Sequence, residues 1–197
     1  MVMHPVTVLI VPGLRDQVAS HWQTLLEARL RALGQAVASV PPMGRADLDC
    51  ATKVAAIEEA VAAIDGPIVL VAHSGGCIMV AHWAGQTHQT HRIHAALLAT
   101  PPDFDQPMPE GYPSQDALQQ GGWFPVPRGS LRFRSLVAAS RNDPLGRYET
   151  VAELAQGWGS DLLDLGEVGH LNPASGFGDW PLADRLIQQL SQAPRAA

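Results

Sequence analysis

Ser74 lies where the sequence predicts a sharp turn from a buried strand into a helix. The strand, residues 68–72 (IVLVA), has no polar side chain to offer to water, and Gly75 and Gly76 follow the serine. Ala72 and Gly76, two residues before and after it, are small enough for the strand and helix backbones to pass close together. Such a turn raises a hydroxyl above the carboxyl edge of a sheet, where the helix N-terminus favours negative charge. Ser74 is therefore predicted to be a nucleophile, with an ordinary tight turn or helix cap as the alternative.

A serine hydroxyl is a weak nucleophile, so it needs a neighbouring base and a third group that fixes the tautomer of that base. Two later strands are followed by suitable side chains. Asp143 follows the strand Leu136–Ser140, and His170 follows the strand Asp161–Leu165. This order of serine, acid and histidine is that of α/β-hydrolases, and it predicts a triad of Ser74, Asp143 and His170.

Each partner of the serine has a competing interpretation. Asp103, which follows the preceding strand, is the rival acid, and Asp143 stands before a proline and could be a simple turn former. His170 could be a surface loop histidine. His73 is adjacent to the serine, but it is expected to point away from it and to pack in the core.

A developing oxyanion requires hydrogen-bond donors. One predicted donor is the backbone N–H of Gly75, the residue after the nucleophile. The second is predicted to be the N–H of Leu14, in the segment 11–15 (VPGLR) that follows the first strand, with Arg15 as the alternative. A plain strand-to-helix turn is the competing interpretation of this segment.

The segment 101–131 contains seven prolines and has no clear hydrophobic period. A loop of this length in a small domain is usually functional or poorly ordered. We expect it to form one rim of the substrate site, because it leaves the sheet at the edge where Ser74 lies. Trp123, Phe124 and Trp180 are predicted to bind substrate, with packing in the core as an equal alternative.

Short β-branched runs alternate with longer amphipathic segments, which predicts a parallel sheet between two layers of helices. We predict six strands in the order 2-1-3-4-5-6, with right-handed crossovers. The strands are Val6–Val11, Ala36–Val40, Ile68–Ala72, Ile93–Ala99, Leu136–Ser140 and Asp161–Leu165. The helices are Gln17–Leu33, Leu48–Ile64, Gly75–Trp83, Arg147–Gln156 and Pro181–Leu190.

The chain has 197 residues, of which 46% are hydrophobic and 16% charged, and this composition predicts one globular domain over residues 1–191 with a flexible tail at 192–197. Its formal net charge of -6 opposes binding to nucleic acid or to anionic lipid. The first residues lack the features of a signal peptide, and no apolar run is long enough to span a membrane. The expected location is the cytoplasm, and the expected state a monomer or weak homo-oligomer.

No metal or other cofactor is expected. The two cysteines, Cys50 and Cys77, are too few for a zinc site and are expected to be buried thiols. The sequence also contains a group of histidines without a nearby carboxylate, which we interpret as solvated side chains at a helix end. They are His82, His88, His91 and His94.

Several blocks of the sequence resemble the small α/β-hydrolases of the YdeN-like, retinoblastoma-binding-protein-like serine hydrolase family. They are residues 11–14 (VPGL) with 20–22 (SHW), 71–74 (VAHS), 124–128 (FPVPR), 139–144 (ASRNDP) and 169–181 (GHLNPASGFGDWP). The resemblance implies a compact hydrolase with Ser74, Asp143 and His170 as triad and no cofactor. Gly75 departs from the family, in which a leucine or similar residue is expected, so we expect a more open pocket floor.

Together these features predict a serine hydrolase that cleaves carboxylic ester or amide bonds of a small molecule through an acyl-enzyme. The alternative is a binding or interaction protein that keeps the hydrolase scaffold without useful turnover. The order of the triad residues favours the enzyme.

Overall fold

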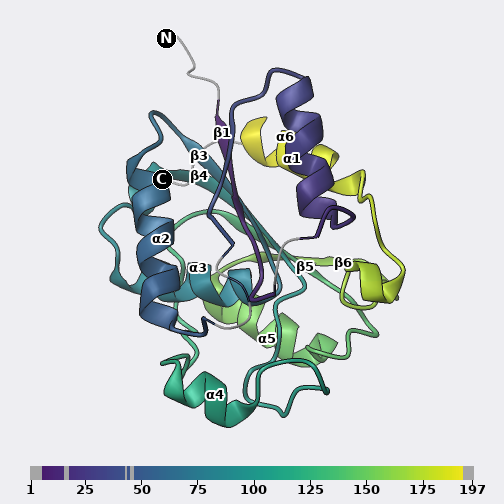
Figure 1. Cartoon of the computed structure of the whole chain (residues 1–197). Coiled ribbons are helices and arrows are strands. Elements are labelled where there is room, and N and C mark those ends of the chain that lie inside the picture. The colour runs from purple at the N-terminus through teal and green to yellow at the C-terminus, as the bar shows by residue number, and fades with distance from the viewer. Residues whose placement is uncertain (1–5, 16–17, 43, 45–46, 193–197) are drawn as a thin grey trace.

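Six parallel strands form one sheet in a computed structural model that describes residues 6–15, 18–42, 44 and 47–192. The strand order is β2-β1-β3-β4-β5-β6, as predicted. Figure 1 labels β1, β3, β4, β5 and β6. The strands are β1 (Thr7–Val11), β2 (Val37–Ser39), β3 (Ile68–His73), β4 (Ile93–Ala99), β5 (Ser135–Ala139) and β6 (Asp161–Asp164). Because all pairs are parallel, the loops that follow the strands gather at one edge of the sheet.

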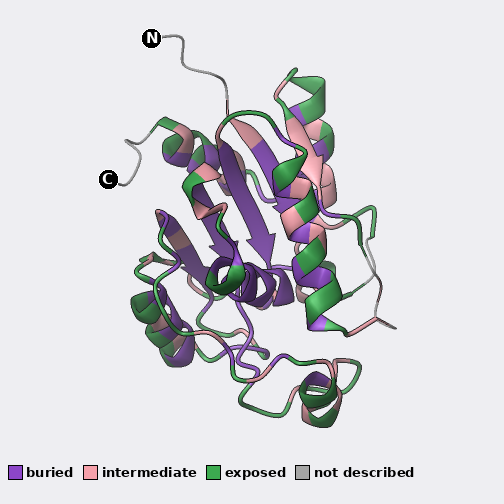
Figure 2. Ribbon diagram, turned by 90° about the vertical axis from the view of Figure 1, so that its left-hand side faces the viewer, coloured by how far each residue is buried: buried purple, intermediate pink, exposed green. Residues whose placement is uncertain are grey.

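Helices cover both faces of this sheet. One face carries α1 (Trp22–Ala32) and α6 (Leu182–Gln192), and the other carries α2 (Cys50–Ala62), α3 (Gly75–Gln86) and α5 (Tyr148–Trp158). Figure 2 shows the buried strands between helices whose outer surfaces are exposed. The three-layer α/β arrangement expected from the sequence is therefore confirmed.

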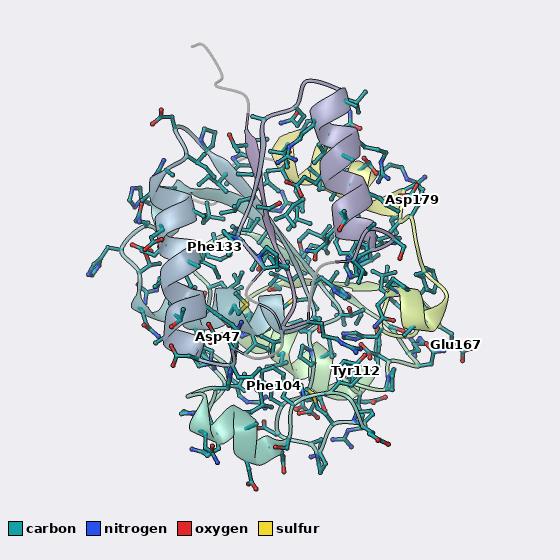
Figure 3. The ribbon with its side chains drawn as sticks, viewed as in Figure 1. Asp47, Phe104, Tyr112, Phe133, Glu167 and Asp179 are labelled. Carbon is teal, nitrogen blue, oxygen red and sulfur yellow. The ribbon has the colours of Figure 1, made fainter. Side chains whose placement is uncertain are left out.

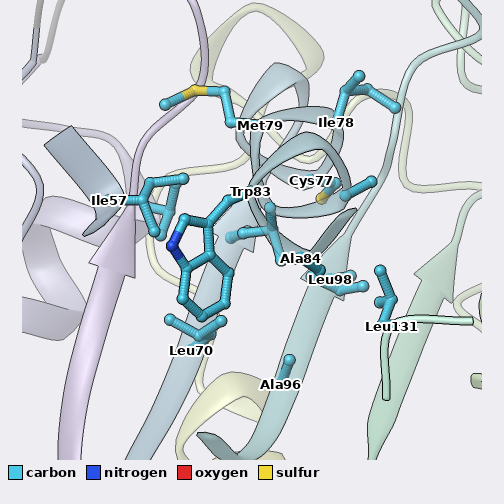
Figure 4. Close-up of a cluster of buried hydrophobic side chains, with 14 of the residues drawn as sticks. Ile57, Leu70, Cys77, Ile78, Met79, Trp83, Ala84, Ala96, Leu98 and Leu131 are labelled. Atoms are coloured by element: carbon cyan, nitrogen blue, oxygen red, sulfur yellow. The ribbon is translucent and has the colours of Figure 1, made fainter. Parts of the chain in front are cut away.

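Alternate side chains of the central strands pack into two hydrophobic cores, one on each face of the sheet. In β3, Leu70 and Ala72 face α2 and α3, whereas Val69 and Val71 face α1 and α6, and none of the four is exposed. This explains why the strand is apolar without alternation. Figure 4 shows the indole of Trp83, on α3, lying against Leu70.

The start of the first helix differs from the prediction. α1 begins at Trp22 and not at Gln17, which lies outside the described residues. His21 caps the helix: its backbone is extended, and its Nδ1 accepts a hydrogen bond from the N–H of Gln23 at 3.1 Å. Histidine is not among the usual capping residues, so the sequence pattern did not mark this boundary.

The segment 101–131 contains an element that the sequence pattern did not predict. It contains a short helix, α4 (Gln115–Gln120), which was not predicted, and Ser114 caps this helix by accepting from the N–H of Ala117. Two further residues of the segment, Phe104 and Tyr112, are labelled in Figure 3. Short 3₁₀ turns, η1 (Thr90–Arg92) and η2 (Pro173–Ser175), complete the elements.

Two other expectations concern the chain as a whole. Within the described residues, no helix has both the length and the apolar character needed to cross a membrane. Of the predicted tail 192–197, Gln192 closes α6, and residues 193–197 lie outside the described residues.

The turn from β3 into α3 is packed against the loop that follows β1. A methyl group added at Gly76 would lie 2.6 Å from the carbonyl oxygen of Pro12 and 2.7 Å from that of Val11. Both contacts are with backbone, so neither neighbour can rotate away. Glycine at this position therefore allows the helix to start beside the loop.

We predict that Gly76→Ala lowers the free energy of unfolding by about 1–3 kcal/mol, because the added methyl group must displace backbone. Gly85→Ala, in the same helix, is the matched control, since a methyl group there meets nothing within 4 Å. That change should leave stability unchanged or raise it by up to about 1 kcal/mol. Urea unfolding of the two variants is the measurement, and equal effects would contradict the packing argument.

Candidate active site

Ser74 occupies a strained turn between β3 and α3. Its backbone has φ 56° and ψ -132°, a conformation that non-glycine residues rarely adopt. The N–H of Ser74 donates to the carbonyl oxygen of Ala99 at 2.9 Å, and the N–H of Cys77 donates to the carbonyl of Ser74 at 2.9 Å. Ser74 is partly exposed although both its neighbours are buried, so the turn presents the hydroxyl to the edge of the sheet.

The structure brings Ser74, His170 and Asp143 together. His170 Nε2 lies 2.7 Å from Ser74 Oγ, and His170 Nδ1 lies 2.8 Å and 3.0 Å from the two carboxylate oxygens of Asp143. The side chains of His170 and Asp143 are only 3% and 2% exposed. A carboxylate at Nδ1 places the proton of a neutral imidazole on that nitrogen, which leaves Nε2 free to accept the serine proton.

Asp103, the rival acid, does not contact His170. It is buried, and its Oδ1 accepts from the N–H of Asp105 at 3.2 Å. Asp143 Oδ1 also accepts from the N–H of Leu145 at 2.8 Å, which fixes the carboxylate toward the histidine. Of the two carboxylates left open by the sequence, Asp143 is therefore the one that lies within hydrogen-bond distance of His170.

Backbone contacts hold the loop that carries His170. The N–H of His170 donates to Ser175 Oγ at 2.9 Å, and the N–H of Gly169 donates to Asn142 Oδ1 at 2.7 Å. The carbonyl of His170 lies 2.9 Å from Nε2 of His73. These positioning contacts were not predicted from the sequence, although Asn142 and Ser175 belong to two of the blocks that carry the family resemblance.

The loop after β1 passes directly over the serine. A methyl group added at Gly13 would lie 3.2 Å from Ser74 Cβ and 3.6 Å from Ser74 Oγ. The N–H groups of Leu14 and Gly75, the two predicted oxyanion donors, have no acceptor within the described part of the chain. They stay candidates for that role, and Arg15 stays the alternative.

Leu14 fills the space that the sequence left open at Gly75. A methyl group added at Gly75 would lie 2.5 Å from Leu14 Cγ, and Leu14 is 7% exposed. The expectation of an open pocket floor is therefore wrong. The leucine side chain reaches this position from the neighbouring loop and not from the residue after the serine.

A cavity of about 360 Å³ opens beside Ser74 and His170. Its walls come from the loop 12–15, the first half of α1, the end of β2 and residues 172–174. From the segment 101–131, Tyr112 lines it. The guanidinium of Arg15 lies 4.9 Å from the centre of the Tyr112 ring, and that ring lies 6.4 Å from the ring of His170.

The three aromatic residues predicted to bind substrate do not line this cavity. Trp123 is fully buried, and its Nε1 donates to the carbonyl of Leu48 at 2.8 Å. Phe124 packs against the same core, and Trp180 packs edge-on against Trp22 under α1. The segment 101–131 thus contributes Tyr112 to the wall, and the structure places Trp123, Phe124 and Trp180 in core packing, the alternative given for them.

Three histidine rings lie side by side at the cavity. The ring centre of His73 is 4.7 Å from that of His21 and 5.1 Å from that of His170. Burial, and secondly the charge that His170 would carry when protonated, lowers the pKa of His21 to about 4. The same two causes hold the pKa of the fully buried His73 well below its usual value. Both rings are therefore neutral near pH 7.

The remaining described histidines and the two cysteines lie away from the three rings. The described residues contain no group of three or more His, Cys, Asp or Glu side chains arranged to hold a metal ion. His82 is buried, with Nε2 3.1 Å from the carbonyl of Trp123, so its expected solvation is wrong. Both cysteines are buried and free, as expected, and burial raises the pKa of Cys50 to about 11.

Comparisons with known proteins agree with this architecture. A YdeN-like hydrolase from Pectobacterium atrosepticum has 28% identity and a TM-score of 0.77, over 95% of this chain and 91% of its own. The ydeN gene product of Bacillus subtilis has 17% identity and a TM-score of 0.72, over 95% and 100%. An esterase domain from Rhodothermus marinus has 18% identity and a TM-score of 0.62, over 89% and 82%. No curated protein matches the chain.

The sheet order and these neighbours define the α/β-hydrolase fold. A family model described as "Serine hydrolase" matches residues 8–189. The chain belongs to this serine hydrolase family, and its structural neighbours place it with the YdeN-like members, as its sequence blocks indicated. The protein is accordingly a hydrolase.

The buried neutral histidines predict how stability responds to acid. The folded pKa of His21, about 4, lies below the value of 6.5 expected for an unfolded chain. Between these values the unfolded state binds more protons, so the free energy of unfolding falls as the pH drops. One such histidine changes the free energy of unfolding by at most about 1.4 kcal/mol per pH unit.

We expect His21→Asn to reduce the slope of the free energy of unfolding against pH, because asparagine can still cap α1 but does not titrate. Urea unfolding at about pH 7 and about pH 5 measures it. His91→Asn, at an exposed position, should leave the slope as in the wild type. A wild-type protein whose stability is flat over this interval would contradict the argument.

Proposed function

We propose that the protein hydrolyses carboxylic ester or amide bonds of small molecules through an acyl-enzyme formed on Ser74. The hydrogen-bonded chain from Ser74 Oγ through His170 to Asp143 supports this proposal, because each atom has the position that nucleophile, base and orienting acid require. Membership of the serine hydrolase family supports the reaction class.

In the first half of the reaction, Ser74 Oγ attacks the carbonyl carbon while its proton passes to His170 Nε2. The carbonyl oxygen becomes an oxyanion, which the N–H groups of Gly75 and Leu14 are proposed to stabilise. When the C–O or C–N bond breaks, the leaving group takes the proton from Nε2. Asp143 stays ionised and stabilises the imidazolium that forms between these steps.

Water completes the cycle by the same route. It gives a proton to His170 Nε2 as its oxygen attacks the acyl carbon, and the proton returns to Ser74 Oγ when the ester bond breaks. The products are the free serine and a carboxylic acid. A cavity of about 360 Å³ is at the lower end of the range for small-molecule sites, which favours small substrates.

We expect Ser74→Ala to abolish labelling by a fluorophosphonate probe and to lower kcat for an activated ester by roughly 10⁴ to 10⁶. Asp143→Asn should lower kcat by about 10⁴, because an amide at this position no longer selects the tautomer that leaves Nε2 free. Probe labelling and initial rates on a panel of short-chain esters are the measurements.

Asp103→Asn is the matched control, since this buried carboxylate follows the neighbouring strand and does not touch His170. Its kcat should stay within about threefold of the wild type. A wild-type protein that neither labels nor hydrolyses any ester would instead support the binding-protein alternative, and undiminished labelling of Ser74→Ala would move the nucleophile elsewhere.

A further prediction concerns the wall of the cavity. Tyr112→Ala should change the ratio of kcat/KM between short and medium acyl esters by about threefold to tenfold, because it removes part of the surface that substrate contacts. Trp123→Phe should instead lower Tm and leave this ratio unchanged, since Trp123 is buried in the core. The opposite assignment of effects would return Trp123 to the substrate site.

A further inference from the structure

His21 lines the cavity beside the candidate catalytic residues without belonging to the chain of hydrogen bonds from Ser74 to Asp143. It is the N-cap residue of α1, and its ring lies near the rings of His73 and Trp22. The contacts of its two ring nitrogens determine what it can offer to a bound molecule.

The helix cap fixes the tautomer of this ring. His21 Nδ1 accepts the N–H of Gln23 at 3.1 Å, so Nδ1 carries no proton. In a neutral imidazole the proton then resides on Nε2, which becomes a hydrogen-bond donor. Burial keeps the ring neutral near pH 7, because it lowers the pKa of His21 to about 4.

The surroundings of this donor determine whether a bound molecule can reach it. Across the described ranges, Nε2 of His21 has no hydrogen-bond partner. The atom is also not fully enclosed. Among the described residues, the enclosed side-chain polar atoms that lack a partner are Trp22 Nε1, Ser39 Oγ and His94 Nε2. Since His21 lines the cavity, its free N–H is available to a molecule bound there.

We propose that His21 is a specificity-determining residue whose Nε2–H donates to an uncharged acceptor oxygen of the substrate. Such an oxygen is an ether, hydroxyl or carbonyl oxygen in the acyl part or in the alcohol part of the ester. The inference rests on the proposed function, because it concerns what the same hydrolase would bind.

Selectivity between substrates follows because a buried N–H group that loses its hydrogen bond to water and gains no other weakens binding. A substrate with hydrocarbon at this position removes water from the N–H without replacing its hydrogen bond, whereas an acceptor oxygen of the same size restores the bond. A neutral donor also discriminates less in favour of anions than a charged side chain does. The wild type should therefore prefer an oxygen-bearing ester to its isosteric hydrocarbon ester.

Two pairs of esters separate the possible sources of the acceptor. Methoxyacetate and butyrate esters of one alcohol differ by an oxygen in place of a methylene group in the acyl part. The 2-methoxyethyl and butyl esters of one acid make the same exchange in the alcohol part. Comparing each kcat/KM ratio between wild type and variant cancels the intrinsic reactivity of the esters.

Two substitutions separate the donor from the cap. His21→Ser keeps a side-chain oxygen for the N-cap but removes the ring, and His21→Phe keeps a ring but removes both cap and donor. His21→Phe should lower Tm by roughly 2–4 °C more than His21→Ser does. Asp49→Ala is the matched control, because it removes the cap of α2, at an exposed position outside the cavity.

Both His21 variants should reduce the preference for the oxygen-bearing ester by about threefold to tenfold in one of the two pairs. Asp49→Ala should lower Tm and leave both ratios unchanged. Loss of preference in the acyl pair or in the alcohol pair supports the inference and identifies the part of the substrate that meets His21.

Unchanged ratios in both pairs, with measurable hydrolysis, would overturn the inference and leave the proposed function intact. A loss of preference in His21→Phe alone would also overturn it, because the effect would then follow the cap and not the donor. Absence of Ser74-dependent hydrolysis in the wild type would overturn the proposed function and this inference with it.

Discussion

The rest of the site depends on one backbone constraint, the left-handed turn at Ser74. Its φ of 56° is costly for a residue with a side chain, by about 1–3 kcal/mol, and the surroundings must maintain it. They do so with the bond from Ser74 N–H to Ala99 on one side and with the close approach of Gly76 to the loop after β1 on the other. The same approach that stabilises the turn brings Gly13 over the serine hydroxyl. One packing contact therefore positions both the nucleophile and the loop proposed to bind its oxyanion.

Hydrogen bonds at every polar group of His170 fix the second part of the site. Nδ1 faces Asp143, Nε2 faces Ser74, the N–H donates to Ser175, and the carbonyl meets His73. Burial keeps the neighbouring rings of His73 and His21 neutral by lowering their pKa values. In the proposed mechanism, a positive charge that develops on His170 consequently has Asp143 beside it, and the adjacent rings of His21 and His73 are neutral. Such surroundings stabilise a protonated His170, because its neighbours are a carboxylate and two uncharged rings.

The sequence predicted the strands and their order because each central strand is an apolar run buried on both faces, and parallel connections allow few arrangements. It also predicted which loops carry Ser74, Asp143 and His170, since all three follow strands at one edge. Side-chain direction could not be predicted in the same way. Trp123 and Tyr112 share one proline-rich segment, but the fold turns the first into the core and the second into the cavity. The role proposed for His21 could not be predicted either, because it depends on a helix cap and a cavity wall that only tertiary structure creates.

Leu14 and Gly75 show how a departure from the family pattern is accommodated. The glycine leaves no side chain after the serine, and the leucine from the neighbouring loop fills that volume. Its backbone N–H is at the same time the second proposed oxyanion donor. Leu14 thus supplies both the side chain that fills the space beside Gly75 and the N–H proposed to donate to the oxyanion. Packing of the leucine side chain therefore restrains the position of this N–H. A smaller side chain at Leu14 would enlarge the cavity and also weaken this restraint, so the proposed mechanism couples the size of the cavity to the stabilisation of the oxyanion.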